Sequence, residues 1–174
     1  MSDNHASSLF NAKLICIMGK VIKERMTAVS ENGYVVFLIG MRINNVFAIH
    51  RWLPVFLAMA KMLPELYKNP QLGFRSHHMW LSRTLILVQY WESAEKLIAY
   101  SKATDSEHLP AWKAFNKAAR KTNSVGIYHE TYIIDPGKSE NVYVNMPKFG
   151  FGKVGDLVPA LGSRKSAGQR LSGK

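Results

Sequence analysis

The chain has 174 residues, of which 47% are hydrophobic and 20% are charged. This composition is typical of one globular domain with a sizeable core and excludes an intrinsically disordered chain. The formal net charge is +11, but the excess is spread along the chain, so we expect nonspecific attraction to polyanions and no specific nucleic-acid recognition.

The sequence carries no sign of export or of a membrane anchor. Its N-terminal residues lack a basic stretch followed by an apolar one, so we expect no secretory signal. The longest apolar run is broken at Arg42, too early for a membrane span. Cys16 is the only cysteine, which excludes an intramolecular disulfide and a cysteine metal cluster. These features favour a cytoplasmic protein.

Three regions are predicted from the composition. Residues 1–21 form an N-terminal extension, and residues 22–162 form one folded domain. Residues 163–174 are mainly Gly, Ser, Lys and Arg, and we expect this basic tail to be disordered.

The central elements are a strand and a helix. Tyr34–Ile43 is almost entirely apolar and is predicted to be a buried strand. From Ile49 to Tyr67 apolar residues recur every three or four positions, which predicts a helix packed on that strand. Pro54 and Pro64 lie inside this pattern and are expected to restart or kink the helix.

Further elements follow in chain order. They are two hairpin strands, two helices and two strands, over the ranges Phe74–Leu81, Thr84–Trp91, Ala94–Lys102, 107–121, Val125–Asp135 and Val142–Met146. The order strand, helix, strand, strand, helix, strand predicts an α+β, ferredoxin-like fold, an antiparallel sheet with helices on one face. Tyr34–Ile43 and Val125–Ile134 are apolar on both sides, so we expect a second copy to cover the other face in a homodimer.

Arg42 and Asn44 are the first candidates for chemistry. They are two residues apart, and alternate residues of a strand share a face. Their guanidinium and amide groups could stabilise an anionic or enolate-like oxygen. Equally, Arg42 could form a buried ion pair with Glu130, while Asn44 caps the helix.

His108 and His129 are the candidate bases. His108 shares the apolar face of its helix with Trp112, where a neutral imidazole could act as a base or bind haem iron, or could simply bond to a nearby backbone group. His129 and Glu130 are adjacent on a strand, so one faces the helices and the other faces the dimer.

Aromatic residues are expected to line an apolar cavity, although most such residues belong to the core. The candidates for substrate contact are Trp52, Trp91, Trp112 and Tyr143. His50, His77 and His78 lack the spacing of metal ligands. His77 and His78 are also adjacent on a predicted strand and therefore point to opposite faces.

Several sequence blocks resemble a known family. GMRINN, RWLPVFLAMAKMLPELY, LVQYWESAEKLIAYS, HLPAWKAFNK, VGIYHETYII and YVNMPKFGFG together resemble a family named for a monooxygenase of fumagillin biosynthesis. The resemblance covers about residues 22 to 162. A looser similarity extends to the antibiotic-biosynthesis monooxygenases of the dimeric α+β barrel superfamily, through Trp91-Ser93-Glu95-Leu97 and His108-Ala111-Trp112-Phe115.

This resemblance implies a dimer that packs through its sheets and a pocket between sheet and helices. It favours a monooxygenase without a cofactor that acts on an apolar phenolic or enolisable substrate. Arg42 and Asn44 would bind the oxyanion, and His108 or His129 would be the base. One alternative that the resemblance implies is a haem protein of the same fold, aldoxime-dehydratase-like or haem-degrading, with one of these histidines as the axial ligand. The other is a non-catalytic binder of an apolar ligand.

Overall fold

The computed structural model describes residues 19–103 and 123–172. It divides into two compact units, which differ from the single domain of residues 22–162 expected from the sequence. The sheet unit is Asn32–Pro136, and the terminal unit combines Met1–Glu31 with Gly137–Lys174.

The sheet unit contains one four-stranded antiparallel sheet. Its strands are β2 (Tyr34–Ile43), β3 (Phe74–Trp80), β4 (Thr84–Trp91) and β5 (Val125–Ile134). Their spatial order is β3-β4-β2-β5, so the first strand of the unit lies between the third and the fourth. This order is that of a ferredoxin-like sheet. The predicted α+β, ferredoxin-like fold is confirmed.

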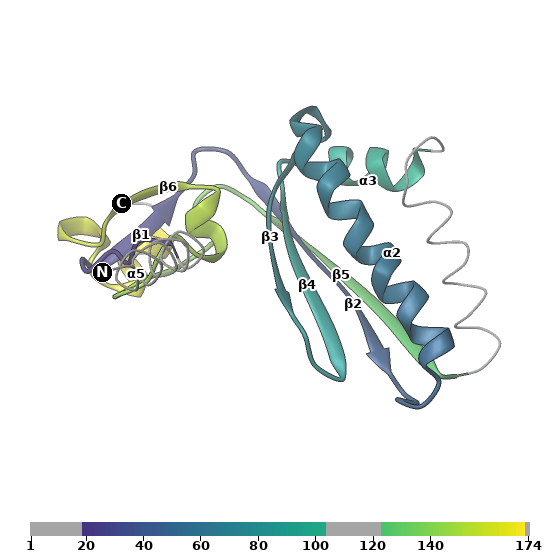
Figure 1. Ribbon diagram of the computed structural model, residues 1–174. Coiled ribbons are helices and arrows are strands. Elements are labelled where there is room, and N and C mark those ends of the chain that lie inside the picture. The colour runs from purple at the N-terminus through teal and green to yellow at the C-terminus, as the bar shows by residue number, and fades with distance from the viewer. Residues whose placement is uncertain (1–18, 104–122, 173–174) are drawn as a thin grey trace, which may run out of the picture. The chain divides into compact units, whose positions relative to one another are not determined.

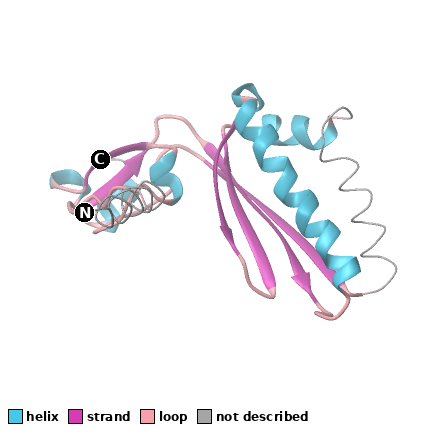
Figure 2. Ribbon diagram, viewed as in Figure 1, coloured by secondary structure: helices cyan, strands magenta, loops and turns pink. Residues whose placement is uncertain are grey.

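Two described helices, α2 (Ile49–Lys68) and α3 (Ala94–Lys102), lie on one side of this sheet (Figures 1 and 2). Ser93 caps α3, because its hydroxyl accepts a hydrogen bond from the backbone nitrogen of Lys96. A short 3-10 turn, η1 (Pro70–Leu72), joins α2 to β3. The expected helix over residues 107–121 lies outside the described residues.

The core lies between α2 and the sheet. One buried cluster joins the first part of α2 to the strands, through Met41, Val55, Met59, Leu85, Leu87 and Val125. A second joins the end of α2 to α3, through Val35, Leu66, Phe74, Trp91, Leu97 and Tyr100. Neither Pro54 nor Pro64 ends α2, and this packing explains why, since burial of an apolar face outweighs a lost backbone hydrogen bond.

The terminal unit contains a small sheet in which β1 (Met26–Val29) pairs antiparallel with β6 (Asp156–Pro159). A 3-10 turn, η2 (Gly150–Lys153), precedes β6. The predicted strand Val142–Met146 is wrong, because Tyr143 and Met146 make only isolated bridges to Met26 and Ile22. Asn145 has a φ of 52°, and this left-handed conformation interrupts an extended strand.

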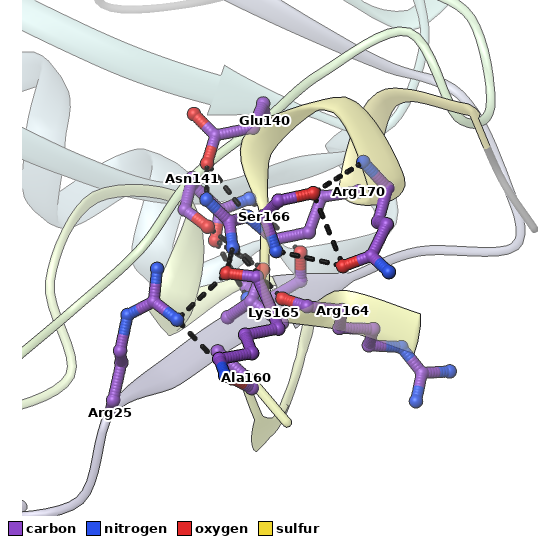
Figure 3. Close-up of polar contacts among 11 residues, drawn as sticks. Arg25, Glu140, Asn141, Ala160, Arg164, Lys165, Ser166 and Arg170 are labelled. Atoms are coloured by element: carbon purple, nitrogen blue, oxygen red, sulfur yellow. Dashed lines mark hydrogen bonds and ion pairs between the residues drawn. The ribbon is translucent and has the colours of Figure 1, made fainter. Parts of the chain in front are cut away.

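The basic tail, expected to be disordered, instead contains η3 (Gly162–Arg164) and α5 (Ala167–Ser172). Arg170 holds this segment in place, since its guanidinium pairs with Glu140 and donates to the carbonyls of Arg164 and Lys165 (Figure 3). Arg25 adds a 2.8 Å hydrogen bond to the Lys165 carbonyl. Among the described residues, no helix is both long and apolar enough to cross a membrane.

Candidate functional site on the helix-facing side of the sheet

A row of side chains crosses the helix-facing side of the sheet. His77 pairs with Gln89, Gln89 pairs with Phe37, and Phe37 pairs with Thr131. Phe37 packs against the buried cluster beneath the end of α2, which places the row on the side that the helices cover. Strand alternation puts His129 on this same side, two residues along β5 from Thr131.

His129 is exposed, and its ring lies 6.0 Å from that of Phe37. It pairs with Ile39, which packs against the core under α2. No hydrogen bond to the imidazole comes from any residue that the structure describes. Glu130 faces the other way, so the prediction that these neighbours occupy opposite faces is confirmed. An unengaged imidazole beside an aromatic ring can accept a proton from a bound apolar ligand.

A phenol and an imidazole meet at the other end of the row. The hydroxyl of Tyr67, on α2, lies 2.9 Å from Nδ1 of His77, on β3. The Tyr67 ring also packs edge-on against Phe74. Burial raises the pKa of the Tyr67 phenol, so the hydroxyl stays protonated at neutral pH. The sequence analysis did not predict this pair. Once the strand pairing is known, the register of Phe37 with Gln89 and of Gln89 with His77 places His77 on the helix-facing side.

Arg42 and Asn44 do not belong to this helix-facing row and form hydrogen bonds outside it. Arg42 lies on the outer face of the sheet, opposite to the side of His129, and donates a 2.9 Å hydrogen bond to Thr84. Asn44 donates from Nδ2 to the carbonyl of Asn123 at 3.0 Å. It is not the helix cap, because α2 begins after Ala48 without any side-chain cap. The structure therefore does not bring Arg42 together with His129.

The predicted ion pair between Arg42 and Glu130 is wrong. Arg42 lies opposite Gly126, whereas Glu130 lies opposite Leu38, so four residues of β5 separate the two positions. That offset is about 14 Å along a strand, beyond the reach of both side chains. Glu130 instead accepts a 2.6 Å hydrogen bond from the hydroxyl of Tyr132 on the same outer face, which raises the pKa of that phenol.

The aromatic candidates are dispersed. Trp91 is fully buried and donates from Nε1 to Gln89 at 2.8 Å, while half-buried Trp52 donates to the carbonyl of Val46 at 3.1 Å. Tyr143 belongs to the terminal unit, where its hydroxyl accepts from the backbone nitrogen of Gly152 at 3.0 Å. His108 and Trp112 lie outside the described residues.

Histidine, cysteine and carboxylate side chains do not gather around a common point in the part of the chain that the structure describes, where no group of three could hold a metal ion. His50 accepts a hydrogen bond from its neighbour Arg51 at 3.2 Å. The ring of His78 lies beside that of Trp80, tilted by 39°, with 5.9 Å between the ring centroids.

The chain belongs to the monooxygenase af470-like family, whose model matches residues 34–151. The matched residues include the whole four-stranded sheet and the candidate site around His129. The family resemblance expected from the sequence is thereby confirmed. Comparison with curated proteins gave no match.

Solved structures share the fold at low sequence identity. An aldoxime dehydratase in complex with butyraldoxime is 18% identical, with a TM-score of 0.61 over 78% of this chain. The match spans only 42% of that enzyme, so the likeness concerns the fold alone.

Two smaller proteins match less closely. The cofactor-independent oxygenase SnoaB from Streptomyces nogalater is 13% identical with a TM-score of 0.42, over 57% of this chain and 91% of its own. A dimeric protein of ferredoxin-like fold from Bacteroides fragilis is 13% identical with a TM-score of 0.40, over 57% of this chain and 96% of its own.

Proposed function

We propose that this member of the monooxygenase af470-like family is a cofactor-independent monooxygenase that acts on an apolar phenolic or enolisable substrate. One observation carries the proposal. His129 is an exposed imidazole on the helix-facing side of the sheet, it lies beside the ring of Phe37, and no residue in the described part of the chain hydrogen-bonds to it. The aromatic ring supplies an apolar contact for the substrate, and the imidazole supplies the base.

The chemistry needs one base and one electron-rich substrate. Neutral His129 removes a proton from the substrate, and the resulting carbanion or phenolate donates electrons to O₂. One oxygen atom enters the substrate, where a CH₂ group becomes a carbonyl, and the other oxygen leaves as water. The substrate is the reductant, and the imidazolium returns its proton to the departing oxygen.

The roles of the other sequence candidates change with this placement. Arg42 and Asn44 are left out, because Arg42 lies on the opposite face and Asn44 is bonded to the loop at Asn123. His108 remains a prediction as an alternative base, and Trp112 as a substrate contact.

Oxygen uptake tests the proposal. Purified protein is screened in an oxygen electrode with phenols and enolisable ketones such as 1-naphthol and 2-tetralone. We expect uptake that falls at least about 100-fold in His129→Gln, because a positioned general base contributes about that much or more. His78→Gln is the matched control, since His78 pairs with Val88 on the outer face. Substrate binding without uptake would favour a passive binder, and equal rates in both variants would exclude His129 as the base.

A haem protein is the second candidate, favoured by the fold that the chain shares with the aldoxime dehydratase. A haem-ligating imidazole normally donates its other ring nitrogen to an acceptor. Within the described residues, nothing accepts such a bond from His129, so the site fits haem poorly. Titration with hemin decides between the two. A sharp Soret band that disappears in His129→Gln would favour haem, and free-hemin features alone would leave the cofactor-free reaction.

We also propose a homodimer that forms through the outer face of the sheet. This face carries the apolar side chains Val36, Leu38, Ile86 and Val88, all only half-buried. Trp80 and Tyr132 are 46% and 49% exposed on the same face. An apolar sheet face of this kind is stabilised when a second sheet covers it.

A further inference from the structure

The amide of Gln89 is a buried polar group for which the described residues provide one hydrogen-bond partner. Gln89 lies at the centre of the helix-facing row, between His77 and Phe37, and is only 2% exposed. Its Oε1 accepts a 2.8 Å hydrogen bond from the indole nitrogen of Trp91. An indole N–H can only donate, so this bond fixes the amide orientation, and Nε2 is the atom that points away from Trp91.

No described residue accepts a hydrogen bond from this Nε2. The two cross-strand neighbours explain why, since the ring of Phe37 offers no oxygen or nitrogen and Nδ1 of His77 is engaged by the hydroxyl of Tyr67. Buried amide donors without a partner are uncommon and unfavourable in folded proteins. An orphan donor in the row that also leads to His129 indicates a position for a ligand oxygen.

We propose that Nε2 of Gln89 binds the phenolate or carbonyl oxygen of the substrate. This inference rests on the proposed function, and it assigns to Gln89 the oxyanion contact that the sequence places on Arg42 and Asn44. A preorganised amide donor in a buried site stabilises negative charge as it develops on oxygen.

The position of Gln89 suits one ligand that also reaches His129. The two residues are two strands apart and two residues out of register, through Phe37 and Thr131. Strand spacing and rise place their Cα atoms about 12 Å apart. A planar substrate lying on Phe37 would therefore meet the amide at its oxygen end and the imidazole toward its other end.

Binding of two matched probes without oxygen tests the assignment. The probes are 4-nitrophenol in its ionised form and 4-nitrotoluene, which replaces the phenol oxygen with a methyl group. We expect wild-type protein to bind 4-nitrophenol more tightly, and Gln89→Met to lose about tenfold or more of that affinity while it binds 4-nitrotoluene as before. Because the titrations are anaerobic, they do not depend on oxygen chemistry, so the proposed function can fail while this site stands.

Leu87→Met is the matched control, because it places a methionine at the neighbouring helix-facing position of β4 and keeps both the amide of Gln89 and its bond to Trp91. We expect this variant to retain the preference for 4-nitrophenol. The proposal is overturned if wild-type protein does not distinguish the probes, if Gln89→Met weakens both equally, or if Leu87→Met loses the preference as well.

A second measurement needs no variant and therefore does not depend on its folding. In nitrogen-15 NMR of the wild-type protein, the side-chain NH₂ signals of Gln89 should shift during titration with 4-nitrophenol and stay in place with 4-nitrotoluene. Gln89 side-chain signals that do not shift with 4-nitrophenol would also overturn the assignment.

Discussion

At the scale of single residues, Glu92, which directly follows β4, links β3 to α3. Its Oε2 lies 2.6 Å from Arg75 on β3, and its Oε1 lies 3.0 Å from Nζ of Lys96 on α3. The hydrogen bond from Lys96, aided by the charges of both partners, holds the pKa of Glu92 below its ordinary value of 4.5. A lowered pKa means that the ionised carboxyl stabilises the folded state at neutral pH.

We therefore predict that Glu92→Gln lowers the free energy of unfolding at neutral pH, and that the difference from wild type shrinks as the pH falls below 4.5. The sign follows because protonation in acid removes the same charge from the wild-type protein. The loss should stay below about 1 kcal/mol, since these ion pairs are partly exposed. Urea unfolding at neutral and acid pH measures it, and an equal loss at both would contradict the assignment.

The chemistry of single residues was only partly predictable from the sequence. Strand alternation alone placed His129 and Glu130 on opposite faces. The meeting of His77 with Tyr67 and Gln89 depends instead on strand register, which a bulge between Phe74 and Ser76 shifts, and on where α2 crosses the sheet. No local pattern in the sequence encodes that crossing.

At the scale of elements, α5 shows how a short helix of six residues is retained by one side chain. The Arg170 side chain is 6% exposed, and that of its partner Glu140 is 27% exposed. The same guanidinium donates to the carbonyls of Arg164 and Lys165, so it closes the turn that precedes α5 (Figure 3). A helix this short has little stability of its own.

We predict that Arg170→Gln loosens residues 162–172. Removing one partner of a largely buried ion pair leaves the other charge uncompensated, so amide hydrogen exchange in this segment should speed up at least about tenfold. Lys165→Gln is the matched control, because it removes one positive charge yet keeps the carbonyl that Arg170 and Arg25 contact. Mass spectrometry of the segment measures the exchange in both variants. Equal exchange in the two would exclude Arg170 as the residue that holds the segment in place.

Long elements were predicted correctly from the sequence, whereas short strands whose partners lie far away in the sequence were not. The ten-residue strands β2 and β5 and the helix α3 were predicted from the pattern of their apolar residues. The four-residue strands β1 and β6 were missed, because each is too short to show a period and its partner lies far away in the sequence. The prediction of a disordered tail was made from composition and is wrong. Composition cannot show that the buried side chain of Arg170 pairs with Glu140 and holds the segment in place.

At the scale of the whole molecule, the two faces of the four-stranded sheet differ. Helices α2 and α3 lie on one side (Figure 2). On the other, Val36, Leu38, Ile86 and Val88 form a half-buried apolar surface beside the exposed rings of Trp80 and Tyr132. The order of the elements predicted both the sheet and this imbalance, and the second copy that the sequence analysis expects on the other face stays a prediction.

We predict that a second copy covers the outer face and that a lysine at the centre of the surface separates the copies. Val88 pairs with Leu38 and His78 in the middle of the outer face, so Val88→Lys would bring an ammonium group into the apolar contact. Leu57→Lys is the matched control, because Leu57 is 49% exposed on α2. In sedimentation experiments wild type and Leu57→Lys should show twice the 19.6 kDa mass of one chain, and Val88→Lys should show 19.6 kDa. A wild-type monomer, or a Val88→Lys dimer, would mean that the outer face serves a different contact.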